Sequence, residues 1–232
     1  MAFWLLLLML TACAAMPTDL SGKMFIFPEE TNTANVKLIP ALSRLTAITV
    51  CLRFKTDLSR NHALFSLATA TNNNAFLIFK DSSGDDIDVY VGNANKEFEG
   101  QDYKLNTWHS ICTTWDAASG LVQLWLDGKS TIKKYFGGPA IVNPIIILGQ
   151  EQDSHGGRFD RSQSFLGMIC DVHVWNYVLS PCEIMRFMND ENYTPGNVVN
   201  WSALTSMTTG RVLTEDKQKA CEEHKQCPGV LY

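Results

Sequence analysis

Several kinds of segment are missing from this chain of 232 residues. It has no block of basic residues, and 19 Lys and Arg against 24 Asp and Glu give a net charge of −5, which argues against nucleic acid as a principal partner. Beyond the N-terminus, no apolar run approaches the roughly 20 residues that a membrane-spanning helix needs, so we expect no membrane span. Internal repeats, low-complexity tracts and interdomain linkers are absent too, which predicts one folded unit.

Motifs of common enzymes are also missing. The sequence contains no Gly-x-Ser-x-Gly nucleophile elbow and no phosphate-binding loop. Glu151 and Asp153 have the spacing of the paired acids in jelly-roll glycosidases, but His155 stands where a third acid would follow. We therefore predict a binding protein rather than an enzyme, with no catalytic residues.

A short apolar run opens the chain. Residues 3–10 are apolar and are followed by small residues up to Ala15, which is the pattern of a signal peptide with its cleavage site. We therefore predict a signal peptide over 1–15 and a secreted, extracellular protein. The rest of the chain is expected to form one domain over 16–213, followed by a charged C-terminal tail over 214–232 that carries two cysteines.

Six cysteines remain once the one in the signal peptide is removed, and an even number is typical of disulfide-bonded secreted proteins. Their spacing favours two local bridges, Cys170–Cys182 and Cys221–Cys227. The second pair could instead link neighbouring subunits of an oligomer. Zinc is a further alternative because Cys221, His224 and Cys227 have ligand-like spacing, but an oxidising compartment and the lack of a clear fourth ligand disfavour it.

Short apolar segments separated by turns predict an all-β fold. Residues 47–54 are rich in β-branched and apolar side chains, and four further segments repeat the pattern: 63–68, 75–80, 87–92 and 121–126. The Asp-Gly pair at 127–128 predicts a hairpin, since a type I′ turn needs residues that tolerate positive φ. One helix is expected to run to about Met188, with Ser180 as its cap and Pro181 at its first position.

An acidic, amide-rich loop over 149–163 has the ligand chemistry of a calcium site. Calcium takes roughly 6 to 8 oxygens from carboxylates, amides, backbone carbonyls and water. Glu151 and Asp153 are two residues apart, so in an extended backbone their side chains share a face, while the carbonyl of Gln152 can point between them. Asp160 and Gln163 can fold back toward the same ions because two glycines precede them. A solvated polar loop is the alternative interpretation.

Three segments carry family motifs: Ile-Cys-Thr-Thr-Trp at 111–115, Gly-Gln-Glu-Gln-Asp-Ser at 149–154 and Val-Trp-Asn-Tyr-Val-Leu-Ser-Pro at 174–181. Together they resemble the short pentraxins over about residues 17–213. The chain departs from the family signature at Ser110, where pentraxins have a histidine, and His109 lies one residue earlier. The resemblance implies a flattened jelly-roll β-sandwich, similar to lectin and laminin-G folds, with one short α-helix and a disulfide between Cys51 and Cys112.

The resemblance also implies a site for two calcium ions per subunit. Its ligands, matched one by one, are Asn73, Asn74, Glu151, the backbone carbonyl of Gln152, Asp153, Asp160 and Gln163. Asp160 stands where relatives have a glutamate, which is one methylene longer. Beside the metal, Phe79 matches a phenylalanine that packs against choline methyl groups, Tyr90 matches an aromatic position, and Asn95 matches a glutamate that faces the choline nitrogen.

By the same resemblance, the protein would recognise phosphocholine, or related phosphorylated or saccharide groups, on microbes and damaged cells in a calcium-dependent manner. Complement is the implied second partner, reached through the opposite face, where Asp127 matches an aspartate implicated in complement binding. A cyclic homo-oligomer, expected to be a pentamer, would strengthen weak sites because each later contact is intramolecular. Two alternatives stay open: a laminin-G-like adhesion module without phosphocholine binding, and a jelly-roll glycosidase.

Overall fold

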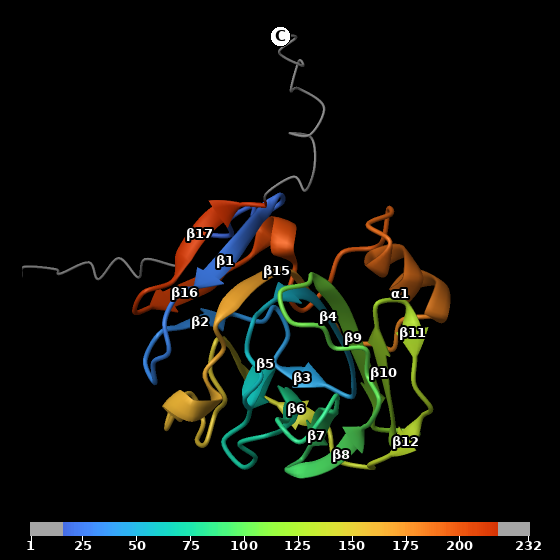
Figure 1. The fold of residues 1–232 in the computed structure, drawn as a ribbon. Helices are drawn as coiled ribbons and strands as arrows, with labels where there is room; N and C mark the ends of the chain where they lie inside the picture. Colours follow the sequence, from blue (N-terminus) through green and yellow to red (C-terminus); the bar gives the residue numbers. More distant parts are fainter. Residues whose placement is uncertain (1–15, 218–232) are drawn as a thin grey trace, which may run out of the picture.

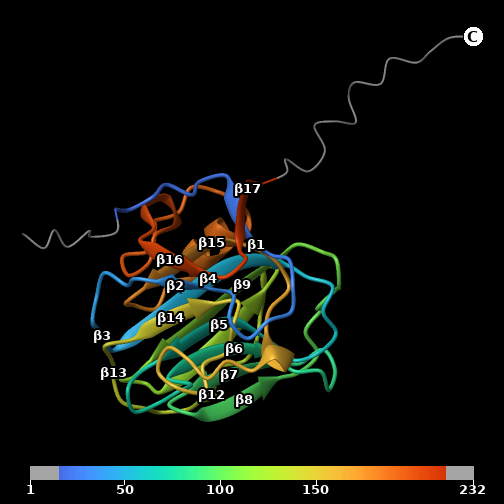
Figure 2. The same ribbon diagram turned by 90° about the vertical axis from the view of Figure 1, so that its left-hand side faces the viewer.

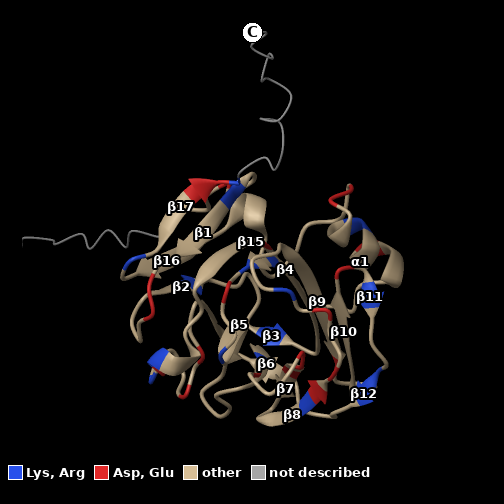
Figure 3. Cartoon of the chain, viewed as in Figure 1, with Lys and Arg blue, Asp and Glu red and all other residues tan. Residues whose placement is uncertain are grey.

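The chain folds into two antiparallel β-sheets that pack face to face, with one α-helix outside the first sheet (Figures 1 and 2). Our computed structural model describes residues 16–217. The predicted signal peptide and the predicted Cys221–Cys227 bridge therefore lie outside the described residues. Between residues 16 and 217, no helix is long and apolar enough to cross a membrane. Lys and Arg are interspersed with Asp and Glu over the elements of both sheets (Figure 3).

The first sheet has the strand order β11-β10-β9-β4-β15-β1-β17, and β12 also pairs with β10. All of these neighbours are antiparallel. The strands are β1 (Lys23–Phe27), β4 (Ala47–Lys55), β9 (His109–Asp116), β10 (Leu121–Leu126), β11 (Lys129–Ser130), β12 (Lys134–Tyr135), β15 (Gly167–Trp175) and β17 (Leu213–Asp216). The last strand places residues 214–216, at the start of the predicted tail, within this sheet.

The second sheet has the strand order β16-β2-β14-β5-β6-β7-β8. Its strands are β2 (Asn35–Leu38), β5 (His62–Ala68), β6 (Phe76–Lys80), β7 (Ile87–Val91), β8 (Ala94–Phe98), β14 (Ile145–Leu148) and β16 (Ser206–Thr209). A separate two-stranded sheet joins β3 (Arg44–Leu45) to β13 (Ile141–Val142). Two short 3₁₀ helices complete the described residues: η1 (Arg161–Gln163) and η2 (Trp201–Ala203).

The core lies between the two sheets, and the alternation of side chains along each strand decides which residues enter it. In β7, Ile87, Val89 and Val91 belong to the core. Asp88 and Tyr90 alternate with them and therefore lie on the outer face of the second sheet. The predicted all-β sandwich is confirmed, and its outer face over β5 to β8 carries the candidate ligand-binding residues.

Helix α1 (Pro181–Met188) packs on the outer face of the first sheet and has the predicted bounds. The Ser180 side chain caps it by accepting a hydrogen bond from the Glu183 backbone N–H at 3.3 Å. Its Ile184 and Phe187 side chains join a second buried cluster with the aromatic and cysteine side chains of the sheet, namely Cys51, Cys112, Trp125 and Trp175. The helix therefore covers the disulfide region and leaves the second sheet uncovered.

One predicted disulfide is present and another is wrong. Cys51 and Cys112 are directly opposite each other in β4 and β9, and they form a disulfide. Cys170 and Cys182 are not bonded to each other: Cys170 is fully buried in β15, whereas Cys182 is exposed on the first turn of α1. The prediction was wrong because it relied on the short separation of Cys170 and Cys182 in the sequence. The chain between these two cysteines leaves the sheet before it forms the helix.

The predicted hairpin is confirmed as well. Strands β10 and β11 pair around Asp127 and Gly128, whose φ angles are 47° and 81°. Positive φ at both central positions is what a type I′ turn requires. The second strand of the hairpin is shorter than expected, since β11 ends at Ser130 and the sheet resumes only at β12.

Candidate functional site

The predicted calcium loop leaves β14 and folds back over the outer face of the second sheet. Gln152, fully buried, fastens it there. Its backbone N–H donates to Ser66 Oγ of β5 at 3.2 Å, and its side-chain amide donates to the Ile145 carbonyl at 3.1 Å. Its side-chain oxygen accepts from the Gly156 backbone N–H at 2.9 Å, so the Gln152 side chain is occupied and its backbone carbonyl remains the candidate metal ligand.

The Asn-rich segment before β6 meets this loop. Asn73 Nδ2 donates to the Asp153 carbonyl oxygen at 2.7 Å, which ties the two segments together across 80 residues of sequence. Asn74 is held from the other side, because its backbone N–H donates to Asn93 Oδ1 at 2.9 Å and its carbonyl accepts from the Asn93 N–H at 3.0 Å. Asn93 was not predicted as a site residue, although an Asn after a strand-ending glycine is typical of a tight turn.

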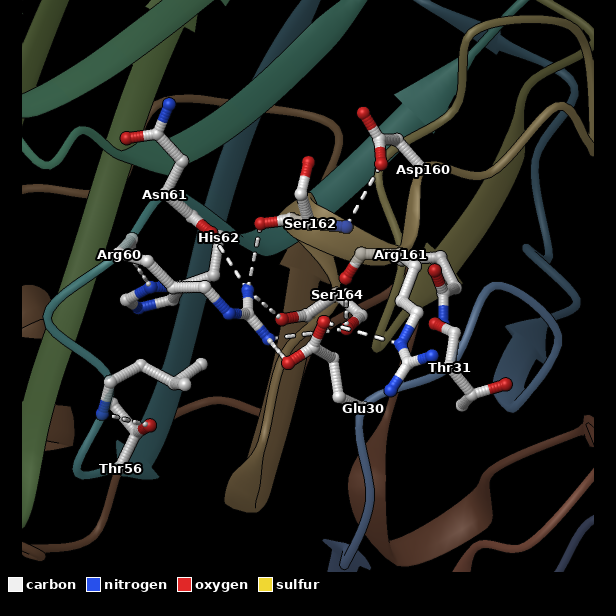
Figure 4. A network of polar contacts seen from close by, with 12 residues as sticks. Glu30, Thr31, Thr56, Arg60, Asn61, His62, Asp160, Arg161, Ser162 and Ser164 are labelled. Carbon is white, nitrogen blue, oxygen red and sulfur yellow. Dashed lines mark hydrogen bonds and ion pairs between the residues drawn. The ribbon is translucent and has the colours of Figure 1, made fainter.

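The second half of the loop is held by Arg60, from the segment before β5 (Figure 4). Arg60 Nη1 donates to the carbonyl oxygens of Ser162 and Ser164 at 2.9 and 2.8 Å. Glu30 lies within ion-pair distance of both Arg60 and Arg161, at 3.8 and 3.3 Å. This network fixes η1, and no local sequence signal indicated that Arg60 would take part in it.

Asp160 and Gln163 lie at the two ends of this η1 segment. Asp160 caps it, with Oδ1 accepting from the Ser162 backbone N–H at 2.9 Å, and that hydrogen bond lowers the pKa of its carboxyl group. Gln163 is half-buried at the end of η1. The segment that carries Asp160 and Gln163 is therefore held by contacts on both sides of the loop.

The buried polar atoms without partners are concentrated in the predicted calcium set. Among residues 16–217, ten buried side-chain oxygen or nitrogen atoms have no hydrogen-bond partner, and four of them are Asn74 Oδ1, both carboxylate oxygens of Glu151 and Gln163 Oε1. Leaving such atoms unpaired is costly, so native proteins rarely do so without a reason. A cation coordinated by these oxygens would remove the cost at all four.

The pKa of Glu151 also indicates that its carboxylate lacks a neighbouring positive charge. Burial raises the pKa of its carboxyl group to about 7, and the neighbouring charges of Asp153 and Asp160 add to the effect. No three His, Cys, Asp or Glu side chains in the described part of the chain converge to hold an ion by themselves. The residues fit calcium only as a mixed set of carboxylate, amide and backbone oxygens, which is the set that calcium favours.

The predicted ligand-binding residues lie next to the calcium set on the outer face of the sheet. Phe79, only 5% exposed, packs with Ala63, Leu77 and the half-buried Tyr90. Tyr90 is directly opposite Asn95 in the β7–β8 pair. Burial raises the pKa of the Tyr90 hydroxyl, and the charges of nearby carboxylates, including Glu151, contribute. Tyr90, which packs with Phe79, therefore lies within electrostatic reach of Glu151.

On the other side of the sandwich, Asp127 is held in a fixed position. Its Oδ2 lies 2.6 Å from His109 Nδ1, and its Oδ1 accepts from the Ser110 backbone N–H at 2.7 Å. His109 is buried and stacks against Tyr103, with ring centroids 5.3 Å apart. This histidine therefore has a structural role. Ser110 occupies the signature position and accepts from Arg53 Nε at 3.2 Å.

The fold and this oxygen-rich face define a lectin-like β-sandwich with a candidate binding site on one face. A protein-family model described as "Pentaxin family" matches residues 23–216. The chain belongs to the pentraxin family.

Individual relatives agree with that assignment. The mouse serum amyloid P-component is 41% identical over 199 residues, which cover 84% of this chain and 88% of the relative. A C-reactive protein of Cavia porcellus is 41% identical over 203 residues, with the same coverage of each chain. Among solved structures, a heptameric SAP-like pentraxin from Limulus polyphemus superposes with a TM-score of 0.78 at 21% identity, covering 88% of this chain and 99% of that one.

The predicted jelly-roll sandwich is therefore confirmed, and the family defines the broad role of the chain. Serum amyloid P-component and C-reactive protein are pattern-recognition proteins rather than enzymes, so this chain is a pattern-recognition protein. The absence of catalytic residues, predicted from the sequence, agrees with the family. Membership also decides against the laminin-G-like adhesion module and the glycosidase as alternatives.

Proposed function

We propose that this pentraxin is a secreted protein that recognises phosphorylated groups on cell and microbial surfaces in a calcium-dependent manner. The observation that carries the proposal is the group of buried, unpaired oxygens on Asn74, Glu151 and Gln163, three of the predicted ligands. Calcium is the metal that both family membership and this donor set support.

We assign the metal to seven residues and two ions per subunit. Buried side-chain oxygens come from Asn74, Glu151 and Gln163, exposed donors from Asn73, Asp153 and Asp160, and the seventh donor is the backbone carbonyl of the buried Gln152. When bound, calcium supplies open coordination positions that attract phosphate oxygens. The protein side of the site positions these donors through the hydrogen bonds of Gln152, Asn93 and Arg60.

Phosphocholine and related phosphorylated or saccharide groups are the ligands that we propose for this face. Phe79 and Tyr90 supply aromatic surface beside the metal, although burial leaves little of Phe79 free to touch a choline group. A cyclic homo-oligomer, which we expect to be a pentamer, would bind a surface with high avidity even if each single site has low affinity. The Limulus relative is described as heptameric, so the subunit number has to be measured.

Complement is the partner that we propose for the opposite face. Helix α1 and the β10–β11 hairpin lie on that side of the sandwich, away from β6 and β7 (Figure 1). Asp127, at the tip of this hairpin, is exposed and is held in place by His109. When the ligand-binding side of each subunit is attached to a cell or microbial surface, the side with helix α1 would therefore stay accessible to a second protein.

The test is retention on phosphocholine and phosphoethanolamine resins in calcium, elution by chelator, and the mass of the eluted assembly. Glu151→Gln should abolish retention and also abolish the rise in melting temperature that calcium produces, because calcium stabilises only the folded form that binds it. The matched control is Glu215→Gln, which removes one exposed carboxylate from β17 in the other sheet. Retention of the Glu151→Gln variant on either resin in excess chelator would refute calcium-dependent binding.

A further inference from the structure

Tyr103, in the segment that joins β8 to β9, is held firmly in the core between the sheets. Its side chain is 8% exposed and belongs to the buried cluster there. The ring stacks on Phe54 of β4 and on His109 of β9, with centroids 5.5 and 5.3 Å apart. Its hydroxyl oxygen lies 2.8 Å from His62 Nε2, and within residues 16–217 it has no other hydrogen-bond partner. The position of this hydroxyl is therefore fixed, and it serves His62 alone.

The protons on His62 can be assigned from its two partners. His62 is fully buried, and its Nδ1 lies 2.7 Å from the Arg60 carbonyl oxygen. A carbonyl oxygen only accepts hydrogen bonds, so Nδ1 carries a proton. Burial lowers the pKa of His62 to about 4, so the ring is neutral near neutral pH and its Nε2 carries no proton. The Tyr103 hydroxyl therefore donates to Nε2, and Nδ1 donates to the carbonyl of Arg60.

Arg60 connects His62 to the calcium loop. While His62 holds the carbonyl group of Arg60, the guanidinium group donates to the carbonyl oxygens of Ser162 and Ser164 at 2.9 and 2.8 Å (Figure 4). These two serines flank Gln163, a predicted calcium ligand whose buried Oε1 has no hydrogen-bond partner. The loop is thus held on either side of a predicted ligand, and the arginine that holds it is itself positioned by His62.

The hold of His62 on Arg60 depends on the Tyr103 hydroxyl. Without that hydroxyl, His62 Nε2 would be a buried acceptor with no partner, which is a costly state. A turn of the imidazole ring toward another donor would relieve this cost, but it would also break the hydrogen bond from Nδ1 to Arg60. His62 therefore keeps Arg60 in place only while Tyr103 occupies its other ring nitrogen.

We propose that Tyr103 is a positioning residue of the calcium site. Its hydroxyl fixes the ring of His62, and His62 fixes the main chain of Arg60. The arginine in turn holds the segment that carries Asp160 and Gln163. This inference rests on the proposed function, since it presupposes that this segment binds calcium. In the described part of the chain, the Tyr103 hydroxyl forms no hydrogen bond with a predicted calcium ligand, so it acts on calcium affinity by keeping the loop ordered before the metal binds.

The test is Tyr103→Phe, which removes the hydroxyl and keeps the stacked ring. Calorimetric titration with calcium should show an affinity about 3- to 10-fold weaker than that of wild type, the range that one net hydrogen bond corresponds to. Tyr193→Phe is the matched control, because the Tyr193 hydroxyl lies 3.2 Å from Nε2 of another buried histidine, His173 in the first sheet. Both variants should lower the melting temperature in chelator, but only Tyr103→Phe should weaken calcium binding.

Combination with Arg60→Met tests the route. Once the arginine is gone, the Tyr103 hydroxyl has no contact with the loop left to position, so adding Tyr103→Phe to Arg60→Met should change calcium affinity by less than about twofold. If the two losses of affinity instead multiply in the double variant, Tyr103 does not act through Arg60 and the proposal is wrong.

The proton positions give a readout on the wild-type protein that needs no variant. In nitrogen NMR spectra, His62 should carry its proton on Nδ1, and a proton on Nε2 of the folded protein would overturn the proposal. If Tyr103→Phe binds calcium as tightly as wild type, the positioning role is wrong while calcium-dependent binding stands. If wild-type protein binds no calcium, the proposed function fails and the inference about Tyr103 fails with it.

Discussion

Replacement of Arg60 tests how the calcium loop is held. Arg60 Nη1 donates to the carbonyl oxygens of Asn61, Ser162 and Ser164, at 2.9, 2.9 and 2.8 Å. The last two hydrogen bonds join the segment before β5 to the η1 region that carries Asp160 and Gln163 (Figure 4). We predict that Arg60→Met, which keeps an apolar stem, destabilises the calcium-free fold and weakens calcium binding as well.

The magnitude follows from the contacts that are lost. A hydrogen bond from a charged donor contributes about 1.5–3 kcal/mol net, and the three acceptors share one nitrogen, so their contributions do not simply add. The Arg60 side chain is 28% exposed and its pair with Glu30 is long, at 3.8 Å, so that pair adds little. We expect a loss of about 2 kcal/mol, which lowers the melting temperature of a domain of this size by about 4–8 °C.

The assay has two arms, thermal unfolding in chelator and calorimetric titration with calcium. Arg186→Met is the matched control: it removes an exposed pair with Glu183, 2.7 Å long, and should cost less than about 0.5 kcal/mol without changing calcium affinity. If Arg60→Met binds calcium as tightly as wild type, Arg60 does not position the metal ligands. If it also melts at the wild-type temperature, the network does not stabilise the loop either.

Three further predictions concern the rest of the molecule. The cysteines of the Cys51–Cys112 disulfide are 61 residues apart. Removing this disulfide should lower the free energy of unfolding by about 4 kcal/mol. Denaturant titrations check this, and an unchanged denaturation midpoint would contradict it. Burial lowers the pKa of His62 and of His173 to about 4. As the pH drops, these histidines are protonated in the unfolded chain before they are protonated in the folded one. The free energy of unfolding should therefore fall between about pH 6.5 and pH 4, by up to about 3 kcal/mol per histidine. A denaturation midpoint that is constant over this range would refute neutral burial. Cys182 should be alkylated in the native protein, whereas the buried cysteine of β15 should react only after unfolding, and equal rates in mass spectrometry would contradict their different burial.

Features that depend on nearby residues were predictable from the sequence. Helix α1 has its expected bounds because the Ser180 cap and Pro181 act within a single turn. The hairpin at 127–128 follows equally from the conformational preferences of two residues. The calcium set was predicted from residue chemistry and from the pentraxin motifs, and three of its members have buried oxygens without hydrogen-bond partners. Their role as ligands stays a prediction until metal is bound.

Features that depend on packing between distant segments were not predictable in this way. The alternation in residues 87–91 places Asp88 and Tyr90 on one face, but it does not indicate that Asp88 is buried without a partner. The role of Arg60 arises from residues about a hundred positions later. The Cys170–Cys182 bridge failed for the same reason, since a short separation in sequence does not place two side chains in contact.

The contrast between two buried carboxylates indicates which face of the sandwich is built to bind a cation. Asp171, on the first sheet, has its own partners: its Oδ2 lies 2.6 Å from Arg53 Nη1 and 2.5 Å from Lys217 Nζ. Although burial alone would raise the pKa of Asp171, these two cations lower it, so its charge is satisfied within the fold. Glu151 and Asp88, on the second sheet, are as deeply buried but lack such partners. Burying an unpaired charge costs several kcal/mol, and the proposed calcium would supply the cation that the fold does not provide at Glu151.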